Sequence, residues 1–223
     1  MMNLPLVFRD GHIFIELEGD LWLLDTGAPK SFGTNCNPAI AGEELTLSKS
    51  YLGLTAETLS EFVGVPCVGL LGADVLGRFD QIIDISGGQF TISTTELTHD
   101  GRLVPLDEFM GIPIVSAQIG GNDYRMFFDT GAKVSYFQDS DLLAEYPPAG
   151  NLTDFFPGIG QFQTETCQLE LTLGDMVFTL RCGQLPGLLG ASLLMADAQG
   201  IIGNQLLINR RVGFFPRRNA LYL

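Results

Sequence analysis

The sequence is poor in basic residues. Only 12 lysines and arginines stand against 26 aspartates and glutamates, which gives a formal net charge of −14. Proteins that bind DNA or RNA present a basic surface, so this balance argues against a nucleic-acid partner. Four of the few basic residues, Arg210, Arg211, Arg217 and Arg218, lie near the C-terminus. Such a cluster can bind an anion, but we expect it to form the solvated face of a hairpin.

Histidine and cysteine are also scarce. The two histidines and four cysteines show no CxxC or Cys/His spacing, so we expect no metal site and no cofactor. His12 lies in a strand pattern and is expected to be a packed or surface residue rather than a catalyst. Cys167 and Cys182 flank a Gly174-Asp175 turn symmetrically, and a two-residue hairpin would place them opposite each other. A disulfide is geometrically possible there, but reduced, buried thiols are the better expectation in a cytoplasmic protein.

Long apolar runs are missing too. Gly, Asp and Arg interrupt every apolar stretch before it reaches the length of a membrane span. The first five residues have neither the basic start nor the apolar core of a signal peptide. We therefore expect a cytoplasmic protein without membrane contact. Hydrophobic residues still make up 46% of the chain and charged residues only 17%, which is enough apolar material for a substantial core.

What the chain does contain is a repeated tetrapeptide. Asp-Thr-Gly-Ala occurs at residues 25–28 and again at 129–132, each time after an apolar, strand-like run and before a serine and an aromatic residue. An ionised carboxylate at the end of a buried strand is costly unless something holds it. Two carboxylates about 3 Å apart cannot both ionise and instead share one proton. The matching contexts therefore indicate two aspartates that meet, which is the chemistry of water-mediated peptide hydrolysis.

The segments around the two tetrapeptides also match. Short β-like runs separated by Gly, Asn, Asp and Pro predict an all-β protein, in which a hairpin delivers each Asp to a loop. Downstream, each half carries two branched apolar residues and a glycine, at 70–72 and at 201–203. A helix is predicted before each glycine, over Thr55–Phe62 with Thr55 as its cap, and over 188–198. These parallels predict a duplication, with lobes at 1–97 and 98–223 and a few short helices.

The two halves differ in one spacing. Asp25 lies 47 residues before Gly72, whereas Asp129 lies 74 residues before Gly203. The additional residues in the second half correspond to the aromatic-rich segment 155–162 and the hairpin after it. Two glycines bracket Ile159 in this segment, a pattern that suits a mobile β-turn tip better than a packed core.

With these motifs the chain resembles the pepsin and retroviral aspartic proteases. The matching features are the doubled Asp-Thr-Gly after two hydrophobic residues, the hydrophobic-hydrophobic-Gly of each half, and the Gly-Ile-Gly tip. The similarity spans nearly the whole chain, which resembles a retroviral homodimer fused head to tail. Two features depart from the family. The only flap-like segment lies in the second half, whereas pepsin carries its flap in the first lobe. The polar residues that retroviral enzymes place after the downstream glycines are replaced by Ala73-Asp74 and Asn204-Gln205.

The resemblance implies a two-lobed, all-β aspartic endopeptidase that acts on a peptide or protein substrate as a monomer with internal pseudo-two-fold symmetry. Asp25 and Asp129 would be its catalytic pair. The residues that support the catalytic loops would be Thr26, Gly27, Ala28, Thr130, Gly131 and Ala132. The substrate-binding flap would consist of Pro157, Gly158, Ile159, Gly160, Gln161 and Phe162.

Other interpretations remain open at this point. Each Asp-Thr-Gly can be a tight turn in which the aspartate caps backbone N–H groups. The same fold can also serve as a non-catalytic module that binds a peptide or protein, or as a dedicated processing protease with a single partner substrate. The remaining carboxylates Asp74, Asp80 and Asp84 are expected to be structural or surface groups.

Overall fold

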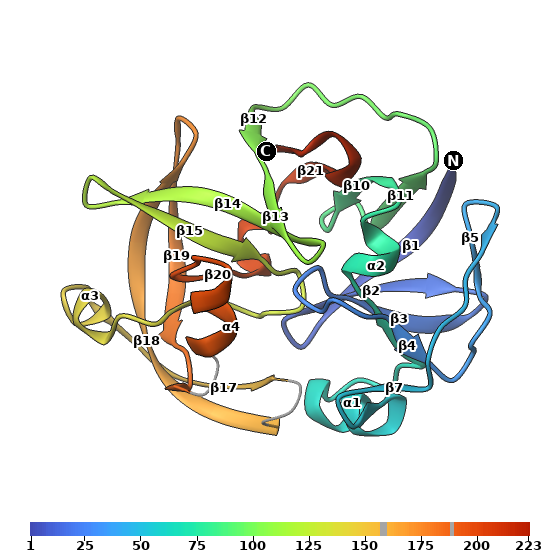
Figure 1. The fold of residues 1–223 in the computed structure, drawn as a ribbon, viewed down its shortest axis with the longest axis horizontal. Coiled ribbons are helices and arrows are strands. Elements are labelled where there is room, and N and C mark those ends of the chain that lie inside the picture. The colour runs from blue at the N-terminus through green and yellow to red at the C-terminus, as the bar shows by residue number, and fades with distance from the viewer. Residues whose placement is uncertain (157–159, 188–189) are drawn as a thin grey trace.

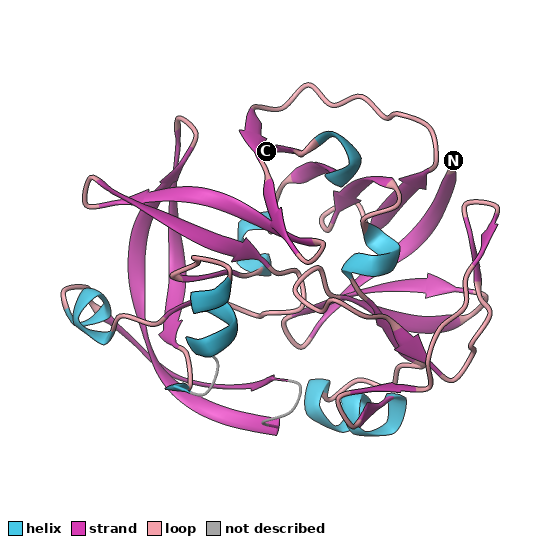
Figure 2. Ribbon diagram, in the orientation of Figure 1, coloured by secondary structure: helices cyan, strands magenta, loops and turns pink. Residues whose placement is uncertain are grey.

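The structure is a computed structural model that describes residues 1–156, 160–187 and 190–223 (Figure 1). It is mostly β, as the sequence predicts, with short helices at the edges of the sheets (Figure 2). The helices are α1 (Ala56–Val63), α2 (Ala73–Leu76), α3 (Ser140–Ala144) and α4 (Gly190–Met195), with 3-10 turns η2 (Asn204–Leu207) and η3 (Pro216–Arg218). No helix in the described ranges is long and apolar enough to span a membrane.

The two predicted helices are present. Thr55 caps α1 as expected, since its hydroxyl accepts a hydrogen bond from the amide of Thr58. The second predicted helix corresponds to α4, while residues 188 and 189 lie outside the described residues. Helices α2 and α3 were not predicted from the sequence. Their four and five residues are too few to show a helical period.

The strands form two large sheets and two small sheets of two strands each. In residues 1–97 they are β1 (Met2–Arg9), β2 (His12–Leu17), β3 (Asp20–Leu24), β4 (Phe32–Gly33), β5 (Ala39–Ile40), β6 (Glu43–Glu44), β7 (Ser50–Tyr51), β8 (Leu54–Thr55), β9 (Gly69–Leu71), β10 (Asp80–Asp84) and β11 (Gln89–Ser93). In residues 98–223 they are β12 (Leu103–Pro105), β13 (Asp107–Phe109), β14 (Ile112–Ile119), β15 (Asn122–Phe128), β16 (Ser135–Phe137), β17 (Pro148–Phe156), β18 (Gly160–Leu173), β19 (Met176–Gln184), β20 (Gly200–Ile202), β21 (Arg211–Phe215) and β22 (Ala220–Tyr222).

The same local arrangement occurs in both halves of the chain. In residues 1–97, the hairpin β2–β3 is followed by β9, which pairs parallel to β3 and antiparallel to β4. In residues 98–223, the hairpin β14–β15 is followed by β20, which pairs parallel to β15 and antiparallel to β16. In the first half, β3 therefore ends beside the parallel strand β9. In the second half, β15 ends beside the parallel strand β20.

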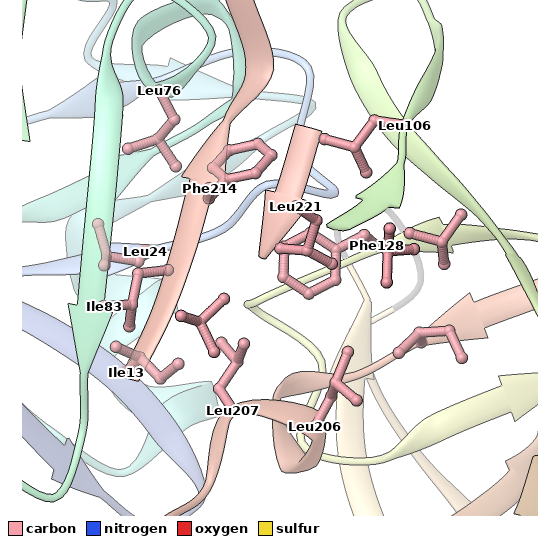
Figure 3. Packing of buried hydrophobic residues seen from close by; sticks show 14 of the residues in the cluster. Ile13, Leu24, Leu76, Ile83, Leu106, Phe128, Leu206, Leu207, Phe214 and Leu221 are labelled. Atoms are coloured by element: carbon pink, nitrogen blue, oxygen red, sulfur yellow. The ribbon is translucent and has the colours of Figure 1, made fainter. Parts of the chain in front are cut away.

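The two halves share a sheet. Its strand order is β12-β22-β21-β10-β11-β1-β2-β3-β9-β4, so the last strands of the chain lie beside strands of the first half. β10 pairs antiparallel with β21, with Gln81 opposite Phe214. One buried apolar cluster runs continuously through both halves, and its members include Leu24, Phe128 and Phe214 (Figure 3). Because the hydrophobic contribution grows with the apolar area removed from water, this shared cluster couples the two halves energetically.

The C-terminal arginines correct one expectation. Arg217 and Arg218 do not form a solvated hairpin face, because both guanidinium groups bind the carboxylate of Asp80, which has no exposed surface. Their closest N–O distances to it are 2.8 and 2.5 Å. A buried carboxylate needs cationic partners. The adjacent residues Arg217 and Arg218, near the C-terminus, therefore neutralise the charge of Asp80 in the first half. The expectation that Asp80 is structural agrees with this position.

The hairpin β18–β19 follows the predicted register. Leu173 lies opposite Met176 across the Gly174-Asp175 turn, and Cys167 lies opposite Cys182. Both thiols are buried and free, as expected for the reduced form.

Candidate functional site

Both tetrapeptides begin directly after a buried strand. Asp25 follows the last residue of β3, and its amide donates to the carbonyl of Leu71 at 3.0 Å. Asp129 follows the last residue of β15, and its amide donates to the carbonyl of Ile202 at 2.9 Å. The parallel neighbours β9 and β20 therefore fix the start of each loop in the same way.

The threonines interlock the two loops. The hydroxyl of Thr26 donates to the carbonyl of Phe128 at 2.6 Å, and the hydroxyl of Thr130 donates to the carbonyl of Leu24 at 2.9 Å. Each hydroxyl also accepts from the amide of the other threonine, at 3.1 and 3.0 Å. Both threonines are buried, so these four hydrogen bonds are shielded from water. The loops, about a hundred residues apart in sequence, form one rigid unit.

The glycines show how closely the two carboxyl groups approach. A Cβ atom added to Gly27 would lie 2.3 Å from Cγ of Asp129, and one added to Gly131 would lie 2.5 Å from Cγ of Asp25. Each carboxyl group thus lies against the glycine of the other loop. Only a residue without a side chain permits this approach. The two aspartates are therefore brought to the same place, as the sequence predicts.

Backbone amides hold one oxygen of each carboxyl group. The amide of Ala28 donates to Oδ1 of Asp25 at 2.8 Å. Oδ1 of Asp129 accepts from the amides of Gly131 and Ala132, at 2.8 and 3.2 Å. All six predicted supporting residues of the loops thus lie at the two carboxyl groups or lock the loops together.

The pKa values of both aspartates are raised. Burial is the largest cause for Asp25, and the negative charge of Asp129 raises its pKa further. Burial also raises the pKa of Asp129, while hydrogen bonds from the amide of Gly131 and from the carboxyl of Asp25 oppose this. The hydrogen bond between the two carboxyl groups raises the pKa of Asp25 and lowers that of Asp129. Because burial raises both pKa values, the pair retains one proton to a higher pH than an isolated carboxyl group does.

The predicted flap is described only in part. Pro157, Gly158 and Ile159 lie outside the described residues. Gly160, Gln161 and Phe162 belong to β18 and pair with Phe156, Phe155 and Asp154 of β17, so these three residues extend the strand ladder and are not part of a turn. The expectation of a tip over all of 157–162 was therefore too wide.

This end of β17 lies against the first half of the chain. The ring centroid of Phe155 is 5.7 Å from that of Phe62 in α1 and 5.9 Å from that of His12 in β2. Figure 1 shows the same proximity of β17 and α1. The strand pair that bears the predicted flap thus reaches across from the second half to the first.

Two buried groups near Asp129 were missed from sequence. The hydroxyl of Tyr136 donates to Oδ2 of Asp154 at 2.6 Å, and both residues are buried. Burial raises the pKa of Asp154, and the charge of Asp154 contributes to the raised pKa of Asp129. Only the aromatic residue after the motif serine was a signal, because nothing in the sequence around Asp154, which stands between Thr153 and Phe155, distinguishes it from a surface carboxylate.

His12 is the third such group. It is fully buried, and Nδ1 lies 3.1 Å from the carbonyl oxygen of Gly131. Burial and the nearby cation of Lys133 lower the pKa of His12 to about 4. The sequence indicated a packed or surface residue at this position, and it gave no sign of a contact with the second loop.

Clusters of metal ligands and cavities outside the two loops would mark other candidate sites. No three His, Cys, Asp or Glu side chains of the described part cluster so that they could hold a metal ion. A cavity of about 940 Å³ lies beside α3 and β18, and none of the residues that line it belongs to the two loops. No protein-family model matches the chain, and no curated protein matches it at a significant level.

Proposed function

We propose that the chain is an aspartic endopeptidase with the two-lobed fold of the pepsin and retroviral proteases, its lobes being residues 1–97 and 98–223. One observation carries the proposal. Two identical loops from the two halves cross so that each carboxyl group lies against the glycine of the other loop. A pair of turns with a capping role alone would not need this approach, nor would it raise the pKa of both aspartates.

The proposed roles of the two aspartates differ. Asp25 holds the shared proton and Asp129 is ionised. This assignment is supported by the amides of Gly131 and Ala132, which both donate to Oδ1 of Asp129 and stabilise a negative charge there. Because both aspartates come from one chain, the pair needs no second copy.

Hydrolysis then proceeds in two steps. Asp129 accepts a proton from a water molecule while the water oxygen attacks the carbonyl carbon of the peptide bond, and Asp25 donates its proton to the carbonyl oxygen. The resulting tetrahedral diol collapses when the proton on Asp129 passes to the leaving nitrogen, the C–N bond breaks, and Asp25 recovers a proton from the diol. One shared proton remains, so the pair is ready for the next cycle.

The flap assignment stays a prediction. Residues 157–162 would cover the substrate and exclude bulk water. The position of Phe155 beside Phe62 and His12 supports this role, because it brings the arm of the predicted flap over to the first lobe.

Cleavage of denatured casein tests the proposal, with the Asp25→Asn variant as control. We expect the wild type to cut casein and the variant to leave it intact while its thermal unfolding is preserved. A pepstatin-like inhibitor should also raise the melting temperature of the wild type. A wild type that binds unfolded casein but never cuts it would identify a binding module instead.

A further inference from the structure

Two side chains outside the tetrapeptides contact the backbone of the second loop. His12 lies at the start of β2 in the first half, and its Nδ1 faces the carbonyl of Gly131. A carbonyl oxygen only accepts hydrogen bonds, so Nδ1 carries the hydrogen and Nε2 does not. Because the pKa of His12 is lowered to about 4, the ring is neutral near neutral pH. Nε2 has no hydrogen-bond partner in the described part of the chain.

The second side chain is Asn204, directly after the glycine of β20. Its Nδ2 donates to the carbonyl of Thr130 at 3.2 Å and to the carbonyl of Gly11 at 2.8 Å. Asn204 is fully buried. Gly11 belongs to the tight β1–β2 turn, with φ of +80°. Asn204 therefore ties the turn that precedes His12 to the second loop.

These contacts act on two particular peptide groups. The carbonyl of Thr130 and the amide of Gly131 belong to one planar peptide group, and the carbonyl of Gly131 and the amide of Ala132 belong to the next. In a trans peptide the carbonyl and the N–H point in opposite directions, so a donor that fixes the carbonyl also aims the N–H. Both of these amides donate to Oδ1 of Asp129. A hydrogen bond to the carbonyl also polarises the peptide group and strengthens the bond that its N–H donates.

The first loop lacks both side chains. Phe14 pairs with Leu23, two residues before Asp25, and Ile114 pairs with Phe127, two residues before Asp129. By this register the equivalent of His12 in the second half is Ile112. Gly72 and Gly203 both precede a short helical turn in extended conformation, so the equivalent of Asn204 is Ala73. Neither Ile112 nor Ala73 carries a side-chain donor.

We propose that His12 and Asn204 are positioning residues that clamp the Thr130–Gly131 and Gly131–Ala132 peptide groups and so orient the two amides that hold the carboxylate of Asp129. The clamp acts on one loop only and makes the pair of aspartates asymmetric. It favours the ionised state on Asp129, in keeping with the role of general base. This inference rests on the proposed proteolytic function.

Two variants remove the clamp by copying the equivalent residues of the other half: His12→Ile and Asn204→Ala. On denatured casein, each should lower kcat about 10- to 100-fold, the order expected for a small misplacement of a catalytic group, while KM changes less than about threefold. His12→Asn places an amide donor where Nδ1 was and should recover kcat to within about threefold of the wild type. Ile112→Leu alters the equivalent side chain of the other half and should leave kcat unchanged.

Backbone amide exchange provides a readout that does not depend on activity. In His12→Ile and Asn204→Ala, exchange should become faster at Gly131 and Ala132 but stay unchanged at Gly27 and Ala28. Unchanged kcat and exchange in both variants would overturn the clamp, as would equal changes in both loops or a failure of His12→Asn to restore them. If the wild type cuts no substrate, the proposed function fails, and the exchange rates alone decide whether the clamp exists.

Discussion

Beyond the threonine hydrogen bonds that join the two loops, the loop that begins at Asp25 is supported by side chains of its own half. Asp74 accepts hydrogen bonds from the amide and the hydroxyl of Ser31, at 2.9 and 2.6 Å, and the same hydroxyl accepts from the amide of Gly72. In the second half, the hydroxyl of Ser135 again accepts from the glycine amide, but the loop is also held by His12 from across the molecule.

The difference lies outside the four residues that the loops share. The contacts among the Asp, Thr and Gly residues are the same on both sides, because each loop is part of the environment of the other. The surrounding side chains make no such reciprocal contacts and differ between the halves: Ala73 is the counterpart of Asn204, and Ile112 is the counterpart of His12. Two similar loops can thus form a symmetric centre while the side chains around each aspartate differ.

Apart from replacing the aspartates themselves, the largest effect should come from adding a side chain at Gly27 or Gly131, where the two loops cross. In Gly27→Ala or Gly131→Ala, the new Cβ would lie within 2.5 Å of a carboxyl carbon of the opposite loop, so one aspartate must move. We expect kcat/KM for casein to fall at least about 100-fold in either variant. Gly187→Ala, where an added Cβ meets no atom of the described residues within 4 Å, is the matched control. Full activity in one of the two loop variants would mean that the opposite carboxyl group is not held there.

A second comparison uses equivalent positions at the joint of the two halves. Counted from Gly72 and Gly203, Asp80 corresponds to Arg211, yet Asp80 is fully buried and Arg211 is exposed. Asp80→Ala leaves two arginines without their carboxylate. Because the side chains of these arginines keep 31% and 32% of their surface exposed, we expect a loss of about 2 to 3 kcal/mol in the free energy of unfolding.

Urea unfolding measures this loss, and Arg211→Ala serves as the control with an expected change below about 1 kcal/mol. Equal effects of the two substitutions would show that the ion pairs of Asp80 do not hold the joint.

Local features of this fold could be predicted from the sequence, because they depend on neighbours along the chain. The hairpins before each aspartate, the Thr55 cap and the turn between Cys167 and Cys182 were all found from alternation and turn residues. The proximity of Asp25 and Asp129 was predicted as well, because the same motif occurs in matching contexts in both halves.

The other contacts between the two halves could not be predicted. His12 and Gly131 are 119 residues apart, and Asp80 and Arg217 are 137 apart. No periodic pattern marks either pair, because their proximity follows from how the two halves pack. The sequence likewise gave no sign that Gly160 to Phe162 continue a strand ladder, since the glycines favoured a turn.

The smallest expected effect concerns the alanines of the two loops, where pepsin-like enzymes that work in strong acid carry Ser or Thr. The amides of Ala28 and Ala132 donate to the two carboxyl groups, but their side chains cannot. A hydroxyl donor stabilises the charged carboxylate and lowers its pKa, so the singly protonated pair would shift to lower pH. We expect a wild-type optimum of roughly pH 5–7. Ala28→Ser and Ala132→Ser should each move the profile of kcat/KM toward acid by about half a pH unit.

A wild-type optimum near pH 2–3 would contradict this argument, as would serine variants whose profiles do not move. A shift in only one of the two serine variants would show which carboxyl group controls the acidic limb of the kcat/KM profile.

The central claim is that the two halves supply one carboxyl group each to a single shared proton. The most direct test is kcat/KM for denatured casein in Asp25→Asn, Asp129→Asn and the double variant, measured beside the wild type. If the pair works as one unit, each single variant loses at least about 1,000-fold and the double variant loses no more than the worse single one, with thermal unfolding preserved in all three. Near wild-type turnover in either single variant, or losses that multiply in the double variant, would contradict the shared pair.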